Sequence, residues 1–246
     1  MDLHKVKFEV LRFRPEQDQE PVFQSYEVDC MDDWVVLDAL NAIKDDIDPT
    51  LSHRWSCRMG VCGSCGMLVN GRPVLTCAAF VRDYPDVIRV EPLSNFPIVR
   101  DLVVELDGFV QKIQSVKPWI IRRIEKDLSE GEYRQSAEQL DEYKQFSMCI
   151  NCALCYAACP VLANEPEFVG PAAIALAHRY NLDSRDEGNA ERFPVLDSHD
   201  GVYACSFANE CSQVCPKHVD PAMAIQQAKL TDFLEWAHIL PKKSFT

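Results

Sequence analysis

The residues of this chain that could do chemistry are its cysteines, which number twelve and fall into groups with regular spacing. The most ordered group reads C-x2-C-x2-C-x3-C-P and consists of Cys149, Cys152, Cys155, Cys159 and Pro160. In this pattern three thiolates hold one iron–sulfur cluster, while the fourth cysteine reaches a second cluster. The fourth cysteine is expected to open a helix, with the proline in its first turn. The pattern therefore requires further ligands elsewhere in the chain.

A second group supplies those ligands but lacks one cysteine, because Ala208 stands where the repeat of the pattern would place it. Sharing the ligands across the two groups gives one set of four thiolates, which predicts a [4Fe–4S] cluster. The other set has three, and alanine offers no oxygen or sulfur for a fourth corner, which favours [3Fe–4S]; a [4Fe–4S] cluster with water at one iron is the alternative. The first set is Cys149, Cys152, Cys155 and Cys215, and the second is Cys159, Cys205 and Cys211.

A third group lies upstream and has the spacing C-x4-C-x2-C-x11-C, which is typical of plant-type [2Fe–2S] ligation. Its members are Cys57, Cys62, Cys65 and Cys77. Glycines at 60, 63 and 66 allow a tight loop whose amides approach the sulfurs. Zinc is the competing metal, since C-x2-C alone suits it. Arg54 and Arg58 beside this loop either raise a cluster potential or face solvent.

Composition limits the remaining possibilities. With 47% hydrophobic residues the chain can form a core, and its net charge of −13 argues against binding to nucleic acid. No apolar run has the length of a membrane span, and the first residues alternate like a strand rather than forming a signal peptide. We therefore expect a chain in the cytosol or facing it, where cysteines serve purposes other than disulfides. Cys30 stands outside the three groups.

The first half of the chain is expected to form a small sheet with one helix. Strands are predicted at 3–14, 22–28 and 88–91, with a hairpin of 67–69 and 73–77 around Asn70 and Gly71. Hydrophobic spacing predicts a helix over 34–46, capped by Asp32 or Asp33. A domain boundary is expected near residue 105.

The second half, residues 106–246, is expected to be mostly helical with its cysteines in loops. Apolar spacing over 102–113 indicates a helix, and another starts near residue 137. Proline in the first turn predicts helices over 171–180 and from 221 to about 238. Segment 183–200 is polar and is predicted to be a loop.

Three clusters in one chain indicate a relay for single electrons. The sequence contains no G-x-G-x-x-G, no nucleophile elbow and no phosphate-binding loop, so no substrate site of its own is expected. The chain is then an electron-transfer subunit, a free-standing carrier, or a relay for some other dehydrogenase. A structural zinc protein is the remaining alternative.

Four segments resemble the iron–sulfur subunit of the succinate dehydrogenase/fumarate reductase family, and are closest to the fumarate reductase branch. They are 54–66 (RWSCRMGVCGSCG), 149–160 (CINCALCYAACP), 170–180 (GPAAIALAHRY) and 215–221 (CPKHVDP). The resemblance implies an α+β fold: an N-terminal β-grasp plant-type ferredoxin domain, then an α-helical bacterial-ferredoxin-like domain.

The same resemblance implies partners and a place in the cell. Such subunits relay electrons, in either direction, between the FAD of a catalytic subunit and a quinone at an integral membrane anchor. The chain would then be a peripheral subunit on the cytoplasmic face of the membrane, held there by the anchor.

The family also implies a quinone pocket beside the [3Fe–4S] end. Pro160, Ser206 and Lys229 stand at the corresponding positions. Ubiquinone-linked members carry tryptophan where this chain has Asn164 and histidine where it has Ser206, so menaquinone is favoured. His218 is expected either to tune the [4Fe–4S] potential or to pack in the core.

Overall fold

The computed structural model describes residues 3–236, which form two compact units. The first unit consists of residues 3–106 together with Ile150–Ala158, and the second of Asp107–Cys149 together with residues 159–236. The short piece 150–158 lies outside the N-terminal range expected from the sequence, yet it packs with that range. None of the helices described in residues 3–236 is both long and apolar enough to cross a bilayer.

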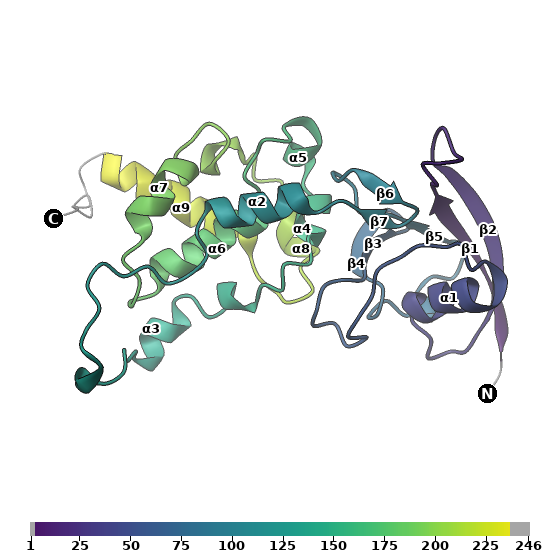
Figure 1. Ribbon diagram of the computed structural model, residues 1–246, viewed down its shortest axis with the longest axis horizontal. Coiled ribbons are helices and arrows are strands. Elements are labelled where there is room, and N and C mark those ends of the chain that lie inside the picture. The colour runs from purple at the N-terminus through teal and green to yellow at the C-terminus, as the bar shows by residue number, and fades with distance from the viewer. Residues whose placement is uncertain (1–2, 237–246) are drawn as a thin grey trace. The chain divides into compact units, whose positions relative to one another are not determined.

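The first unit is built on a mixed five-stranded sheet in the order β2-β1-β5-β3-β4 (Figure 1). Strand β1 is antiparallel to β2 and parallel to β5, and β3 is antiparallel to both β4 and β5. The predicted strands are confirmed within a few residues. Their bounds are β1 His4–Arg12, β2 Val22–Cys30, β3 Gly66–Val69, β4 Arg72–Leu75 and β5 Ile88–Glu91.

Alternation along β1 and β2 places one set of side chains in a core between the sheet and a helix. Phe8, Val10 and Val28 are buried there, and Trp34 packs against the same core. Full burial of each large apolar side chain contributes about 1.5–3 kcal/mol relative to exposure. Cys30 also belongs to this core, and burial raises the pKa of its thiol to about 11.

The helix of the first unit is shorter than predicted and is capped differently. Helix α1 spans Val36–Ala42 and continues as a wider π-helical turn, η1, over Ile43–Ile47. The predicted cap at Asp32 or Asp33 is wrong, because Val35 is the N-cap residue and Asp38 accepts a hydrogen bond from its amide. The first helical amides instead bond to the carbonyls of Thr76 and Ala79. Helix α1 is thereby tied to the segment that carries Cys77.

The predicted hairpin around Asn70 and Gly71 is confirmed. Both residues are left-handed, with φ of 48° and 78°, as a tight two-residue turn between strands requires. The side chain of Asn70 accepts a hydrogen bond from the amide of Arg89 at 2.7 Å, which joins the turn to β5. Cys77 lies two residues after this hairpin, and the antiparallel pairing of β3 and β4 brings it back close to Cys65.

The helix predicted from residue 102 begins later than expected. Residues Ile98–Arg100 and Val103–Val104 form a small hairpin, β6 and β7, and helix α2 spans Asp107–Ser115. Leu102 packs in the core of the first unit, so it is apolar because of that core and not because it lies on the buried face of a helix. The hairpin turn includes Asp101, whose φ is 46°.

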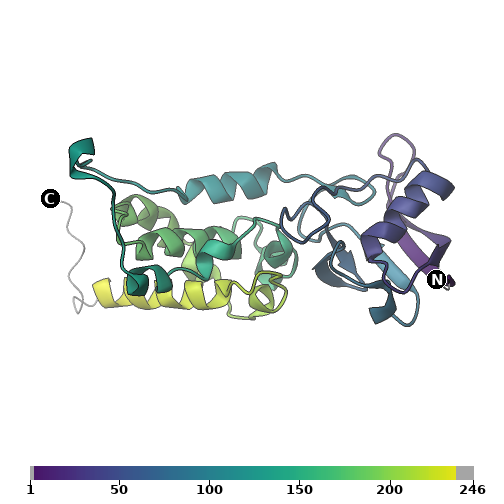
Figure 2. The ribbon, with the colours of Figure 1, turned by 90° about the horizontal axis from the view of Figure 1, so that it is seen from below.

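The second unit is helical, with α6 and α9 packed against each other (Figures 1 and 2). His178 on α6 lies 2.7 Å from the side-chain oxygen of Gln227 on α9. Phe146, Ala175, Val219 and Ala224 form a buried cluster. The helices and short turns are η3 Leu128–Glu130, α3 Ala137–Asp141, η4 Phe146–Met148, α5 Pro160–Asn164, α6 Pro171–Leu182, α7 Asn189–Leu196, η5 Val202–Ala204, α8 Glu210–Gln213 and α9 Pro221–Trp236.

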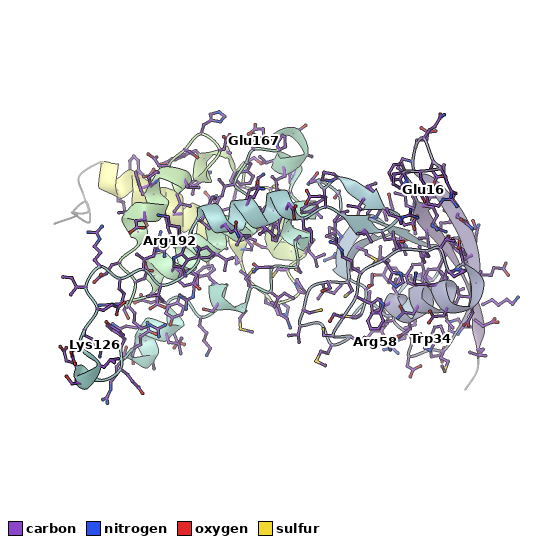
Figure 3. All side chains as sticks on the ribbon, viewed as in Figure 1. Glu16, Trp34, Arg58, Lys126, Glu167 and Arg192 are labelled. Atoms are coloured by element: carbon purple, nitrogen blue, oxygen red, sulfur yellow. The ribbon has the colours of Figure 1, made fainter. Side chains whose placement is uncertain are left out.

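The helices starting near residues 137, 171 and 221 are confirmed, the first with a capping box at Ser136. The predicted end of the last helix at about residue 238 lies outside the described residues. The prediction of a loop over 183–200 is wrong, because α7 lies within it and even contains Pro194. Arg192 on α7 is fully buried and bonds to Asp186 and to the carbonyls of residues 117 and 119. Figure 3 shows Arg192 among these helices, whereas Lys126 lies on the segment near η3.

Candidate metal-cluster sites

The first candidate site is the loop that carries Cys57, Cys62 and Cys65. The amides of Met59, Val61 and Cys62 point at the sulfur of Cys57, with N to Sγ distances of 3.4, 3.5 and 3.3 Å. Left-handed conformations at Arg58 and Gly60, with φ of 58° and 66°, turn these amides inward. Amide donors around a thiolate stabilise its negative charge and that of a bound cluster.

Thiol electrostatics differ across this site. The hydroxyl of Ser64 and nearby amides lower the pKa of Cys62 to about 6. Burial, followed by the neighbouring Cys65 sulfur, raises the pKa of Cys77 to about 11. Thr76 donates from both its amide and its hydroxyl to the carbonyl of Cys65, at 3.1 and 3.0 Å, and so fixes the hairpin end beside the loop. The structure thus brings all four sulfurs of the upstream group to one end of the sheet.

Two arginines flank this loop. Arg58, which is labelled in Figure 3, stacks on Trp55, with 4.4 Å from the guanidinium carbon to the ring centre. Arg54 lines a pocket that also contains Cys62 and Cys152.

The cysteines of the C-x2-C-x2-C-x3-C-P group are divided between the two units: Cys152 and Cys155 belong to the first, and Cys149 and Cys159 to the second. In the first unit, Cys152 and Cys155 lie at the start of helix α4, Leu154–Ala157. Asn151 and Ala153 are left-handed, with φ of 53° and 63°, so the chain curls around this point. The hydroxyl of Ser94 donates to the carbonyl of Ala157 at 2.7 Å, and the side chain of Asn95 donates to that of Tyr156 at 2.8 Å.

In the second unit, Cys149 and Cys215 both pack against the buried cluster around Phe146. The amide of Val219 donates to the sulfur of Cys215 at 3.3 Å. His218 beside it is exposed and left-handed, with φ of 56°, so the expectation of a packed core histidine is wrong.

The third candidate site lies entirely in the second unit. Cys159, Cys205 and Cys211 line one pocket together with Ala208. Cys159 is the N-cap of α5, as its position before proline predicts, and the amide of Phe207 donates to the sulfur of Cys205 at 3.4 Å. Phe207 and Asn209 are left-handed on either side of Ala208.

Burial raises the pKa of Cys211 to about 12 and raises that of Cys159 as well. These thiols are therefore protonated unless a bound metal takes the place of the proton. Within residues 3–236, no three Cys, His, Asp or Glu side chains are arranged as ligands of a single metal ion. Thiolate-only donor sets with amides aimed at sulfur fit iron–sulfur clusters.

The three residues expected at a quinone pocket lie close to the third site. Pro160 and Ser206 line the same pocket as Cys159, Cys205 and Cys211. Lys229 on α9 donates to the carbonyl of Cys205 at 2.9 Å. Asn164, at the end of α5, donates from its side chain to the carbonyl of Pro160 at 3.0 Å.

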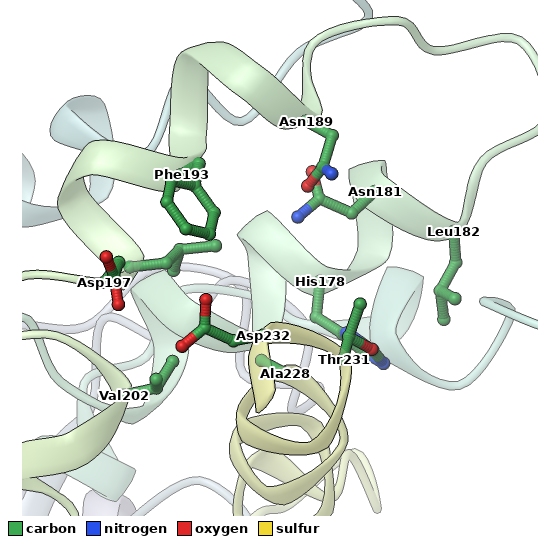
Figure 4. Close-up of a pocket in the computed structure, with 11 residues that line it drawn as sticks. His178, Asn181, Leu182, Asn189, Phe193, Asp197, Val202, Ala228, Thr231 and Asp232 are labelled. Atoms are coloured by element: carbon green, nitrogen blue, oxygen red, sulfur yellow. The ribbon is translucent and has the colours of Figure 1, made fainter. Parts of the chain in front are cut away.

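Sequence reasoning missed a pocket in the second unit that is lined by two carboxylates, Asp197 and Asp232 (Figure 4). Asp232 on α9 accepts a hydrogen bond from the hydroxyl of Tyr203, and Asp197 lies beside it. Burial and the charge of Asp232 raise the pKa of Asp197. These residues come from separate elements and form no motif, so the pocket could not be predicted from the sequence.

Comparisons with known proteins identify two iron–sulfur domain families along the chain. A family described as a 2Fe-2S iron-sulfur cluster binding domain matches residues 7–111, and one described as a 4Fe-4S dicluster domain matches residues 145–219. The fumarate reductase iron-sulfur subunit of Mycobacterium tuberculosis is 58% identical over 93% of this chain and 93% of its own length. The succinate dehydrogenase iron-sulfur subunit of Coxiella burnetii is 36% identical over 93% of this chain and 97% of its own length. A chain of the Mycobacterium smegmatis Sdh1 complex in the apo form has a TM-score of 0.79 at 29% identity, covering 98% of this chain and 99% of that one.

Proposed function

The chain belongs to the family of iron–sulfur subunits of fumarate reductase and succinate dehydrogenase, and we propose that it relays single electrons through three clusters between the FAD of a flavoprotein and a quinone. It is an electron-transfer subunit of a quinone-linked oxidoreductase, part of a complex associated with a membrane. The clusters supply one-electron redox chemistry when bound. The chain's own residues bind them, set their spacing and exclude water.

Residues 1–105 form the proposed [2Fe–2S] domain, of β-grasp plant-type ferredoxin fold. Its ligands are Cys57, Cys62, Cys65 and Cys77. The amides around Cys57 and the lowered pKa of Cys62 support this proposal, because both favour thiolates that carry negative charge.

Residues 106–246 form the proposed domain of bacterial-ferredoxin type, which carries a [4Fe–4S] and a [3Fe–4S] cluster. The first would be held by Cys149, Cys152, Cys155 and Cys215, and the second by Cys159, Cys205 and Cys211. The observation that carries this assignment is the pocket in which three cysteines and Ala208 lie together. The methyl group of alanine offers no donor atom for a fourth iron.

The proposed quinone pocket contains Pro160, Ser206 and Lys229, beside the [3Fe–4S] site. The ammonium group of Lys229 is held near that site by the carbonyl of Cys205, where it can donate to a quinone oxygen and follow its change in charge. Asn164 and Ser206, in place of the tryptophan and histidine of ubiquinone-linked members, support menaquinone. The flavoprotein and the integral membrane anchor are the proposed partners, with this chain on the cytoplasmic face.

The experiment that tests this function is a redox titration of the purified complex followed by electron paramagnetic resonance (EPR). We expect three distinct iron–sulfur signals, including an oxidised signal of [3Fe–4S] type, together with succinate-dependent dye reduction. Iron and acid-labile sulfide should be present in place of zinc. Detection of [4Fe–4S] species without a [3Fe–4S] signal would defeat the argument from Ala208.

A further inference from the structure

Two ligand loops of the first unit touch each other at a glycine. Gly63 lies between Cys62 and Cys65 in the upstream loop, and Cys152 lies in the piece of chain 150–158 that packs with this unit. A Cβ atom placed on Gly63 would lie 2.8 Å from the Cβ and 2.9 Å from the Cα of Cys152. Real Cβ atoms do not approach other carbons so closely, so any side chain at Gly63 would displace Cys152.

A second glycine extends the contact. A Cβ atom on Gly66 would lie 3.1 Å from Cδ2 of Leu154 and 3.2 Å from the carbonyl oxygen of Cys152. The two glycines flank Cys65, so the main chain on both sides of that cysteine lies against residues 152–154. Packing of this kind, backbone against backbone, is possible only where side chains are missing.

The far side of the second loop is fixed as well. Ser94 and Asn95 hold the carbonyls of Ala157 and Tyr156, so the segment that follows Cys152 cannot swing away freely. Cys62, Gly63, Gly66 and Cys152 also line a common pocket. The segment around Cys152 is therefore held on one side by the glycines of the upstream loop and on the other side by Ser94 and Asn95.

We propose that Gly63 is a positioning residue for electron transfer, and that electrons cross between the [2Fe–2S] and [4Fe–4S] clusters at its contact with Cys152. The inference rests on the proposed function, in which Cys62 and Cys65 hold the first cluster and Cys152 helps to hold the second. In the step, one electron leaves the reduced cluster and enters the oxidised one, while no bond is made or broken and no proton moves. The rate of tunnelling falls exponentially with separation, so an increase of a few tenths of an ångström at this contact slows the step.

The chain offers a matched control in the same loop. Gly60 and Gly63 are both left-handed, with φ of 66° and 76°, so alanine strains the backbone at either position. A Cβ atom on Gly60, however, meets nothing within 4 Å. Effects that Gly60→Ala and Gly63→Ala share come from backbone strain, and the difference between them reports the contact with Cys152.

The experiment compares both variants in the intact complex with its flavoprotein and anchor. Two quantities are measured: the microwave power that half-saturates the [2Fe–2S] EPR signal while the [4Fe–4S] cluster is reduced, and the rate of electron transfer between the clusters after a light-driven electron pulse. In Gly63→Ala we expect both signals to remain while the half-saturation power and the rate fall relative to Gly60→Ala, the rate by up to about twofold. Equal values in the two variants, with both clusters present, would overturn the proposal.

A milder variant covers the case in which Gly63→Ala loses a cluster. Gly66→Ala presses on the flexible Leu154 side chain and the Cys152 carbonyl, so it should give a smaller fall in the same direction; wild-type values in this variant would then overturn the proposal. Failure of the proposed function has a different signature. The unmodified complex would lack the [2Fe–2S] or the [4Fe–4S] signal, or contain zinc, whatever residue stands at 63.

Discussion

The guanidinium group of Arg12 and the carboxylate of Asp101 form an ion pair inside the first unit, with 3.0 Å between Nε and Oδ1. The two side chains are 1% and 0% exposed, although 89 residues separate them in the chain. Asp101 also accepts hydrogen bonds from the amides of Phe13 and Ser52. The pair thereby joins the end of β1 to the β6–β7 turn and to the segment leading into the [2Fe–2S] loop.

Replacing Arg12 by methionine should destabilise the first unit strongly. The substitution leaves the buried carboxylate of Asp101 without its partner, which typically costs about 3–5 kcal/mol. Denaturant unfolding of the full cluster-loaded chain, followed by visible absorbance of the clusters, measures the loss. Arg14→Met is the control, because the Arg14–Asp18 pair is only half-buried, with side chains 30% and 14% exposed, and ion pairs in contact with water contribute less. A similar loss of unfolding free energy in the two variants would show that burial does not make the Arg12 pair more important for stability than the Arg14 pair.

The cysteine groups and the hairpin around Asn70 could be predicted because local spacing and turn chemistry determine them. Helix α7 could not be predicted from apolar spacing. Its buried face includes Arg192, which is paired with Asp186, at a position where an amphipathic helix would normally carry an apolar residue. Leu102 led to the prediction of a helix from residue 102, but its apolar side chain packs in a core formed by strands distant in the sequence. Likewise, the contact of Gly63 with Cys152 depends on long-range packing that spacing alone does not encode.

Substituting Ala208 by cysteine should convert the proposed [3Fe–4S] site to a [4Fe–4S] site. The pocket already contains three cysteine sulfurs, and the new sulfur would stand at the corner that lacks a ligand. We expect the oxidised [3Fe–4S] EPR signal to disappear and the iron content of the chain to rise. Ala208→Val, which adds bulk without a donor atom, should keep the original signal. Persistence of the [3Fe–4S] signal in Ala208→Cys would mean that residue 208 does not face the missing corner.

Replacing Lys229 by methionine should impair the reaction with quinone selectively. A hydrogen bond from a charged donor contributes about 1.5–3 kcal/mol, so quinone-linked turnover should fall by about 10- to 100-fold. Succinate-dependent reduction of an artificial dye that accepts electrons before the quinone should stay near its wild-type rate. Lys144→Met, at an exposed lysine of the second unit, serves as the control. An equal loss of dye reduction in Lys229→Met would indicate a structural role, through the bond to the Cys205 carbonyl.

The stability of the first unit should fall as the pH drops below 6.5, because of His53. Burial, together with the charge of Lys44, holds the pKa of His53 at about 4, and its Nε2 lies 3.0 Å from Asn41 Oδ1. The unfolded chain therefore binds a proton at this histidine near pH 6.5, whereas the folded chain does so only near pH 4. Stability is complete above the upper value and declines by up to about 3 kcal/mol between the two. Denaturant unfolding measured from pH 7, just above this window, to pH 5, inside it, should show a weaker pH dependence for His53→Gln than for the wild type. His4→Gln, at an exposed histidine on β1, should keep the wild-type slope; if His53→Gln keeps it too, His53 is already protonated in the folded chain across this range.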